Sequence, residues 1–170
     1  LKVAQNGNYD ASAVEFIVSS GNAMHEDLLR GLHKQFGPVV CNFYGSTENS
    51  VVAIAKREEL AENPALAGRP VRGVRVKILD DDGNVLPPNT PGRIYARGTM
   101  TMRRYALTRD RMKIKHGLLE IGDRGYLDEE GRLFVLGRAD DMIIVGGENV
   151  YPRSVEEVPV SYTHLRAHET

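Results

Sequence analysis

The stretch from Val14 to Tyr44 most constrains the fold, because a strand pattern, a helix pattern and a second strand pattern follow one another. The apolar, β-branched run at residues 14–20 predicts a buried strand, and "VVCNFY" at residues 39–44 predicts another. Between the two runs, apolar side chains recur at helical spacing, at Met24, Leu28, Leu29, Leu32 and Phe36. This order predicts two parallel strands joined by a right-handed helical crossover.

The rest of the chain changes to short strands separated by acidic, glycine-containing turns. Residues 75–86, "RVKILDDDGNVL", predict two strands around a turn, residues 92–98 predict another strand, and residues 124–137 predict a hairpin closed at Gly131. Residues 138–157 predict a polar turn, a short strand, a Gly-Gly turn and a proline-started helix. We therefore expect a mixed α+β fold: a partial α/β subdomain, then a β-rich antiparallel sheet or distorted barrel, then a third unit.

Composition excludes several classes of protein. The 170 residues are 41% hydrophobic and 26% charged, with a net charge of −1, which argues against binding nucleic acid or an anionic membrane. No apolar run reaches membrane-spanning length. The single cysteine, Cys41, cannot form an internal disulfide and is expected to be a small buried thiol. These features fit a cytoplasmic protein.

The string "CNFYGSTENS" at residues 41–50 places an aromatic ring, a glycine, two hydroxyls and a carboxylate together after an apolar run. One interpretation is a plain turn after a strand. Three further strings stand in order around it: "SSGNAM", "EIGDRGYLDEEGRLFVLGRADDMI" and "VGGENVYPRSVEE". Together the four strings resemble the adenylate-forming (AMP-binding) superfamily and, within it, the acyl-CoA synthetases. The form "GGENVYP" looks like fatty acyl-CoA synthetases rather than adenylation domains that load a carrier protein.

The resemblance implies a nucleotide site with named parts. The Tyr44 ring would lie against adenine, Gly45 would let backbone approach the ligand closely, and Thr47 would contact phosphate. Glu48 would hold Mg²⁺, for which a carboxylate is a suitable hard ligand. Thr47 and Glu48 are the residues that it implies for catalysis. The cofactor-binding residues that it implies are Gly21, Asn22, Ala23, Tyr44, Gly45, Ser46, Thr47, Asp123, Arg138, Gly146 and Gly147.

Within that set, Asp123 would accept hydrogen bonds from ribose, and Arg138 would contact ribose or phosphate. Two positions depart from the usual family pattern. Asn22 and Met24 replace a glycine and a proline in the adenine-contacting turn, and Ile121 stands where a threonine usually precedes Gly-Asp. Any role of that threonine is therefore absent here. The alternative for Gly21–Ala23, Asp123 and Arg138 is an ordinary place in a turn or at a solvated strand end.

The family resemblance also implies a hinge and a second substrate. Asp140, two residues after Arg138, matches the residue about which a small C-terminal subdomain rotates. Gly146 and Gly147 match the loop that faces CoA after the rotation, although a simple Gly-Gly hairpin competes with this interpretation. Residues 1–65, 66–138 and 139–157 are thus predicted to be the end of an α/β nucleotide-binding subdomain, a β-rich subdomain, and the hinge with the start of a C-terminal subdomain.

Two catalytic features of the family have no counterpart in the chain: the glycine-rich phosphate loop with its lysine, and a lysine near the C-terminus. The chain therefore resembles an internal piece of a longer ligase that uses ATP, Mg²⁺, a carboxylic acid and CoA, and the piece alone is expected to be inactive. The alternatives are a carrier-loading adenylation domain or a non-catalytic fragment with a residual nucleotide surface. Residues 158–170 depart from the family and resemble translated sequencing-adapter sequence, so we expect them to be artefactual.

Overall fold

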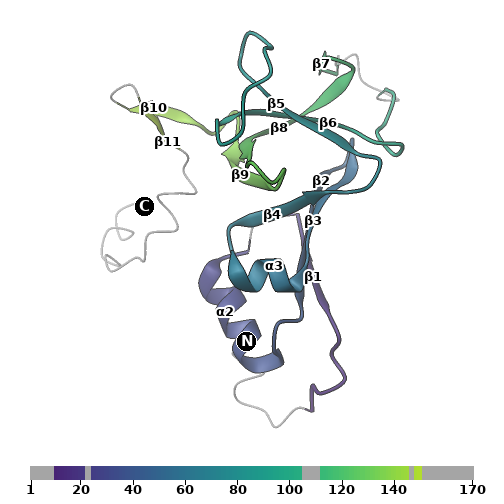
Figure 1. The fold of residues 1–170 in the computed structure, drawn as a ribbon, viewed down its shortest axis with the longest axis vertical. Coiled ribbons are helices and arrows are strands. Elements are labelled where there is room, and N and C mark those ends of the chain that lie inside the picture. The colour runs from purple at the N-terminus through teal and green to yellow at the C-terminus, as the bar shows by residue number, and fades with distance from the viewer. Residues whose placement is uncertain (1–9, 22–23, 105–111, 146–147, 151–170) are drawn as a thin grey trace, which may run out of the picture.

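The computed structural model describes residues 10–21, 24–104, 112–145 and 148–150. Most of the described strands form one nine-stranded mixed sheet in the order β1-β2-β3-β4-β9-β8-β6-β5, with β7 paired to β8 (Figure 1). The elements of its first half are β1 (Ile17–Ser20), α2 (Glu26–Phe36), β2 (Val40–Ser46), β3 (Ser50–Ala55), α3 (Arg57–Glu62) and β4 (Leu66–Pro70). Those of its second half are β5 (Arg75–Leu79), β6 (Gly92–Arg97), β7 (Ile114–Lys115), β8 (Leu118–Leu127) and β9 (Leu133–Arg138). A separate hairpin joins β10 (Ile143–Val145) to β11 (Glu148–Val150).

The predicted order of strand, helix and strand is confirmed, but the first strand is shorter and less buried than expected: β1 begins at Ile17, and Phe16 and Val18 are 64% and 46% exposed. β1 and β2 pair in parallel, with Ile17 opposite Val40, and α2 connects them. The predicted helical face is largely right: Leu29 is buried, and Met24 and Leu32 pack against the same core cluster. Leu28 is the exception at 42% exposed, because it lies on the solvent side of the helix. Cys41 is half-buried rather than fully buried.

The β-rich half is antiparallel, as predicted, but one of its hairpins differs. The turn after β5 forms, with Asp80 accepting hydrogen bonds from the backbone N–H groups of Gly83 and Asn84. The returning residues, however, make a single bridge between Leu79 and Val85, and β5 pairs instead with β6. Val85 is 49% exposed, so it offers little apolar burial to hold a strand there. The hairpin of β8 and β9 is confirmed.

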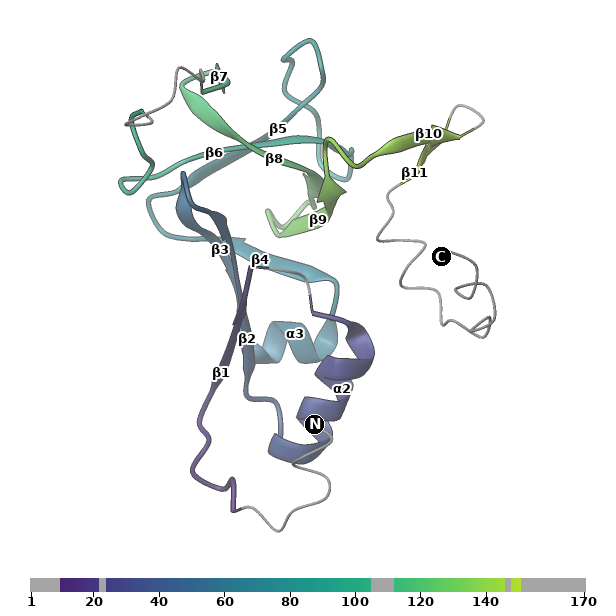
Figure 2. The same ribbon diagram turned by 180° about the vertical axis from the view of Figure 1, so that it is seen from behind.

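Two core clusters support the two halves of the sheet. One lies under the β-rich half and includes Val52, Ile78, Ile94 and Leu133. The other joins α2, α3 and the first strands through Leu29, Val40, Ala55, Leu60 and Leu66, and Phe134 of β9 completes it. Figure 2 shows α2 and α3 on the same side of β1 and β2. In the described part of the chain, no helix has the length and apolar character needed to cross a membrane.

One continuous sheet includes strands from both sides of the boundary predicted between residues 65 and 66. β4 begins at Leu66 and pairs with β3 on one edge and with β9 on the other, so it links the two halves of the sheet. The turn, strand and Gly-Gly hairpin predicted after residue 138 correspond to the bend at residues 139–141 and the β10–β11 pair. The predicted proline-started helix lies outside the described residues.

Candidate functional site

A cleft of about 450 Å³ lies where the carboxyl ends of β1 and β2 meet β8 and β9. Ligands of α/β sheets commonly bind beyond the carboxyl ends of parallel strands. The predicted site residues that line this cleft come from four separate segments and are Gly21, Tyr44, Gly45, Ser46, Thr47, Glu48, Asp123 and Arg138. The structure therefore brings together residues that are up to 117 positions apart in the sequence, counted from Gly21 to Arg138.

Asp123 is the centre of the polar contacts in the cleft. Its Oδ2 accepts a hydrogen bond from the Tyr44 hydroxyl at 2.7 Å, and its Oδ1 accepts one from Arg138 Nη1 at 3.1 Å. Asp123 and Arg138 are direct cross-strand partners on β8 and β9. The Asp123 side chain is 13% exposed whereas that of Arg138 is 56% exposed, so the carboxylate is held inside while the guanidinium reaches the opening.

The Tyr44 hydroxyl is a fixed donor to this carboxylate. Burial raises the pKa of Tyr44 well above its ordinary value, and the nearby negative charge of Asp123 raises it further. A tyrosine with the ordinary pKa of 10.0 is already protonated at neutral pH, so its hydroxyl donates to Asp123 there, and the raised pKa extends this range to more alkaline pH. The predicted place of the Tyr44 ring against adenine stays a prediction, and the structure adds a contact from the ring's hydroxyl to Asp123.

The absence of a side chain at Gly122 allows the guanidinium of Arg138 to lie against β8, the strand that carries Asp123. Its φ is +90°, and a Cβ there would lie 2.9 Å from Arg138 Nη2. A larger residue at position 122 would therefore be strained and would displace the guanidinium. The carbonyl of Gly122 also accepts a hydrogen bond from the backbone N–H of Ala139 at 2.9 Å. The Gly-Asp pair thus positions the end of β9 as well as Asp123.

Gly45 has a role in strand pairing, while its predicted close approach to a ligand stays a prediction. The pairing of β2 with β3 shifts register between Tyr44 and Gly45. A Cβ at Gly45 would overlap the backbone carbonyl of Ser50 on β3. The glycine borders the cleft, but the close approach that excludes a side chain is between two strands of the sheet.

The turn from Thr47 to Asn49 carries the predicted phosphate and metal residues. Thr47 is exposed and Glu48 is half-buried, and both line the cleft. The backbone carbonyl of Glu48 accepts a hydrogen bond from the N–H of Met102 at 2.7 Å. Asn49, the last residue of the turn, is only 3% exposed, and no sequence motif predicted a role for it. A polar residue after a strand usually faces solvent, so its burial had no sequence signal.

One end of the cleft is apolar, a feature that no sequence motif predicted. Its lining there comes from the segment just before α2 and from α2, β2, α3 and β4, and includes Met24, Leu29, Val40, Leu60, Leu66 and Ala67. The helix α3 was not predicted, because its six residues are too short to show a helical repeat. The cleft therefore joins a polar end, where hydrogen bonds and charge can hold an anion, to an apolar end.

The remaining predicted site residues lie elsewhere. Asp140 is exposed in the turn between β9 and β10 and does not line the cleft. Asn22, Ala23, Gly146 and Gly147 lie outside the described residues. Their predicted roles in binding adenine and CoA therefore stay predictions.

The charged groups of the cleft fit a nucleotide whose phosphates and one protein carboxylate together coordinate a metal ion. Over the described ranges, no three His, Cys, Asp or Glu side chains gather into a metal cage. Mg²⁺ commonly takes one or two protein carboxylates and completes its shell with water and phosphate oxygens. Glu48 in the cleft wall offers one such carboxylate, and Arg138 offers a cation at the opening.

Comparison with known proteins gives the same family by sequence and by structure. The model of the AMP-binding enzyme family matches residues 1–106. The indoleacetate–CoA ligase of Aromatoleum aromaticum is 35% identical over 152 residues, which cover 88% of this chain and 30% of that protein. The o-succinylbenzoate CoA synthetase of Bacillus subtilis, solved with its acyl-adenylate intermediate, superposes with a TM-score of 0.83 at 34% identity. That match covers 95% of this chain and 34% of the synthetase.

A third relative is named for a different activity. The amide bond synthetase of Marinactinospora thermotolerans superposes with a TM-score of 0.82 at 32% identity, over 92% of this chain and 33% of that structure. The chain thus spans about a third of the length of each of these three relatives. With a family model matched over more than half of its residues, and with structural relatives that share its fold, the chain belongs to the AMP-binding enzyme family of adenylate-forming enzymes.

Proposed function

We propose that the protein is an ATP- and Mg²⁺-dependent acid–thiol ligase. In the first step a carboxylate oxygen attacks the α-phosphorus of ATP and pyrophosphate leaves, which gives a mixed acyl–AMP anhydride. In the second step the sulfur of CoA attacks the acyl carbon and AMP leaves. The observation that carries the proposal is the contact of Tyr44 and Arg138 with Asp123 in a cleft that also contains Thr47 and Glu48.

Each residue of the cleft has a proposed role that suits its geometry. Asp123 accepts hydrogen bonds from the ribose hydroxyls, since each of its oxygens retains a free lone pair after bonding to Tyr44 or Arg138. Arg138 contacts the ribose or the phosphate, and the Tyr44 ring lies against adenine with the Gly21 turn. Thr47 donates to a phosphate oxygen. Glu48 would hold Mg²⁺, which when bound neutralises phosphate charge.

The acid is proposed to carry an aromatic ring. The sequence favoured a fatty acid, but two relatives are named for indoleacetate and o-succinylbenzoate, both aromatic carboxylates. The apolar end of the cleft is compatible with either class. A panel of indoleacetate, 2-succinylbenzoate and straight-chain fatty acids offered to the full-length protein separates them, and a preference for the fatty acids would overturn the aromatic proposal.

The acceptor of the acyl group is proposed to be CoA, through the predicted loop at Gly146 and Gly147. The amide bond synthetase among the relatives favours a second candidate, in which an amine attacks the same anhydride. To distinguish the two acceptors, the full-length protein first forms acyl–AMP and is then given CoA or an amine. The product, a thioester or an amide, identifies the acceptor. A carrier protein as acceptor is a third outcome of the same test. We propose that the 170-residue chain alone does not adenylate. ATP–pyrophosphate exchange measured on it beside the full-length protein tests this, and ATP titration of both shows whether the chain still binds the nucleotide.

The proposed metal role is tested by Glu48→Gln in the full-length protein. The substitution preserves shape and removes the charge that a hard cation requires, so ATP–pyrophosphate exchange is expected to fall by about a hundredfold or more. Circular dichroism and Tm should stay near the wild-type values, because Glu48 lies in a turn at the cleft wall. Exchange at the wild-type rate in this variant would contradict the assignment.

A further inference from the structure

Asn49, directly after the proposed metal residue, is a buried polar side chain. It is 3% exposed, and its Oδ1 accepts a hydrogen bond from the Thr101 hydroxyl at 2.9 Å. Its backbone N–H donates to Ser46, whose carbonyl and hydroxyl oxygens both lie 3.2 Å away. Burying an amide side chain is unfavourable unless its polar groups are paired, so this arrangement needs a physical reason.

Thr101 belongs to a segment that follows β6 and is distant in the sequence. The backbone N–H of Gly98 donates to the Thr101 hydroxyl at 2.8 Å, which leaves that hydroxyl's hydrogen free to point at Asn49. One residue later, the N–H of Met102 donates to the carbonyl of Glu48 at 2.7 Å. Two successive residues of the turn, Glu48 and Asn49, are therefore tied to two successive residues of this segment.

Two unfavourable features occur beside this connection. Nδ2 of Asn49 is a buried donor for which the described residues provide no hydrogen-bond partner. The next residue, Ser50, has φ +59°, a left-handed conformation that non-glycine residues rarely adopt. An orphaned donor and a strained backbone at adjacent positions are costs that proteins tend to retain where geometry serves a function.

We propose that Asn49 is a positioning residue that, through Thr101, holds the Thr47–Glu48 turn in the conformation needed for a divalent cation. The proposal rests on the proposed function, because it assigns the metal to Glu48. A turn that is held before the cation arrives loses less conformational freedom on binding, so the affinity for the cation is higher. The hydrogen bond from Thr101 to Asn49 thus sets how much Mg²⁺ the protein requires.

The test uses the full-length protein and compares Thr101→Val, which removes the hydroxyl, with Thr101→Ser, which retains it. Mn²⁺ is titrated by electron paramagnetic resonance in the presence of a non-hydrolysable ATP analogue, and Mg²⁺ activation of ATP–pyrophosphate exchange is measured in parallel. The valine variant should need about five- to tenfold more cation for half-saturation, the effect of one lost hydrogen bond, and the serine variant should stay within about twofold. The KM for the acid should not change.

Asn49→Leu should act in the same direction, and combining it with Thr101→Val should add little, because both remove one interaction. Thr90→Val is the matched control: this half-buried threonine donates to the carbonyl of Pro88 and does not line the cleft, so cation affinity should not change. If Asn49→Leu does not fold, the two Thr101 variants decide the outcome, since Thr101 is only half-buried.

Wild-type Mn²⁺ affinity in Thr101→Val, whether or not its Tm falls, would overturn the positioning role. Loss of Mn²⁺ affinity in Thr101→Val with Thr101→Ser unaffected would support it even if the wild-type protein showed no pyrophosphate exchange. In that case only the proposed ligase activity would fail, so the two failures are distinguishable.

Discussion

At the scale of single residues, the Asp123 carboxylate is held by two side chains and still has lone pairs for a ligand. Tyr44 and Arg138 occupy one lone pair on each carboxylate oxygen and fix the plane of the group. The remaining lone pairs can accept from two neighbouring hydroxyls, such as those of a ribose. Tyr44 is therefore more than a ring for stacking, because its buried hydroxyl orients the group that is proposed to hold the sugar.

Tyr44→Phe in the full-length protein retains the ring and removes only this hydroxyl. We expect the KM for ATP to rise by about tenfold, since a hydrogen bond to a charged group is lost and Asp123 becomes less constrained. The preference for ATP over 2′-deoxy-ATP should narrow, while the KM for the acid stays constant. Steady-state pyrophosphate exchange with both nucleotides measures these values.

Tyr126→Phe is the matched control for this substitution. Tyr126 stacks on Phe134 at a centroid distance of 4.9 Å and does not line the cleft. Removing the Tyr126 hydroxyl should leave the preference for ATP over 2′-deoxy-ATP unchanged. An equal effect of both substitutions on the KM for ATP would show that the Tyr44 hydroxyl has no specific role.

At the scale of elements, irregularities in the strands shape the site. The register shift at Gly45 interrupts the pairing of β2 with β3, which then continues to Ser46, just before the turn that carries Thr47 and Glu48. Another shift, between Arg124 and Gly125 of β8, directly follows Asp123. Bulges of this kind are common next to binding sites, where they redirect side chains. Both register shifts thus lie next to side chains that line the cleft, Tyr44 and Asp123.

The turn between β9 and β10 is the proposed hinge. Ala139 is anchored by its hydrogen bond to Gly122, and Asp140 follows as an exposed residue. Asp140→Pro fixes φ near −65° and should restrict rotation about this point. In the full-length protein, ATP–pyrophosphate exchange should persist, because Tyr44, Asp123 and Arg138 all precede the turn. Formation of acyl-CoA should fall by about tenfold or more.

Both half-reactions are measured on one preparation, with Asp140→Ala as the control that removes the carboxylate and leaves the backbone free. The Asp140→Ala variant should retain both ATP–pyrophosphate exchange and acyl-CoA formation. If the proline variant loses the two half-reactions by the same factor, or loses neither, Asp140 is an ordinary turn residue.

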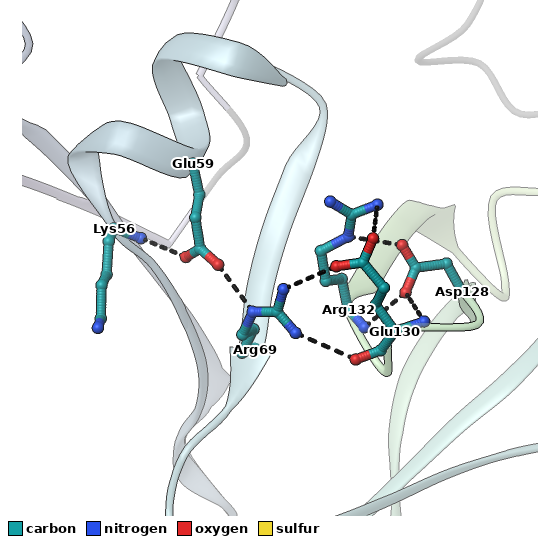
Figure 3. A network of polar contacts seen from close by, with 6 residues as sticks. All are labelled: Lys56, Glu59, Arg69, Asp128, Glu130 and Arg132. Atoms are coloured by element: carbon teal, nitrogen blue, oxygen red, sulfur yellow. Dashed lines mark hydrogen bonds and ion pairs between the residues drawn. The ribbon is translucent and has the colours of Figure 1, made fainter.

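At the scale of the whole molecule, Arg69 of β4 connects the α/β and β-rich halves (Figure 3). Its guanidinium donates to Glu59 of α3 at 2.8 Å, and to the side chain and backbone of Glu130 at 3.0 Å each. Glu59 in turn accepts from the backbone N–H of Lys56 at the start of α3. Glu130 lies in the turn between β8 and β9, so one side chain bridges the helix and the hairpin whose strands supply Asp123 and Arg138.

Arg69→Met, which retains most of the apolar stem and removes the charge, should lower Tm slightly, by about 1–2 °C. The effect is small because Arg69 and Glu130 are about half exposed, and such pairs contribute little to stability in water. The difference should shrink in about 1 M salt, where charges on the surface are screened. Thermal unfolding at low and high salt measures both effects.

Arg57→Met is the control for the bridge, because Arg57 pairs with its neighbour Glu58 within the same helix. It should change Tm less than Arg69→Met does. An equal fall in Tm for both variants would mean that linking two elements adds nothing beyond an ordinary surface ion pair.

Much of the fold could be predicted because its signals are local. The strand and helix patterns of residues 14–44 depend on the spacing of neighbouring side chains, and the hairpin at Gly131 depends on a few turn residues. The family followed from four short motifs, which the AMP-binding enzyme match confirms. The second strand expected near Val85 failed because pairing depends on the partner strand, and β6 was the better partner.

The sequence by itself determined the first strand–helix–strand unit, the antiparallel character of the later strands, the family and the residue types proposed for the site. Only the tertiary structure decided that Tyr44 donates to Asp123, that Gly45 is required by the neighbouring strand, and that Asn49 is buried against Thr101. These features depend on distances between segments that lie 50 or more residues apart or on the register of strand pairs. Local periodicity carries information about which face a side chain occupies, but burial and hydrogen bonding are properties of the packed chain.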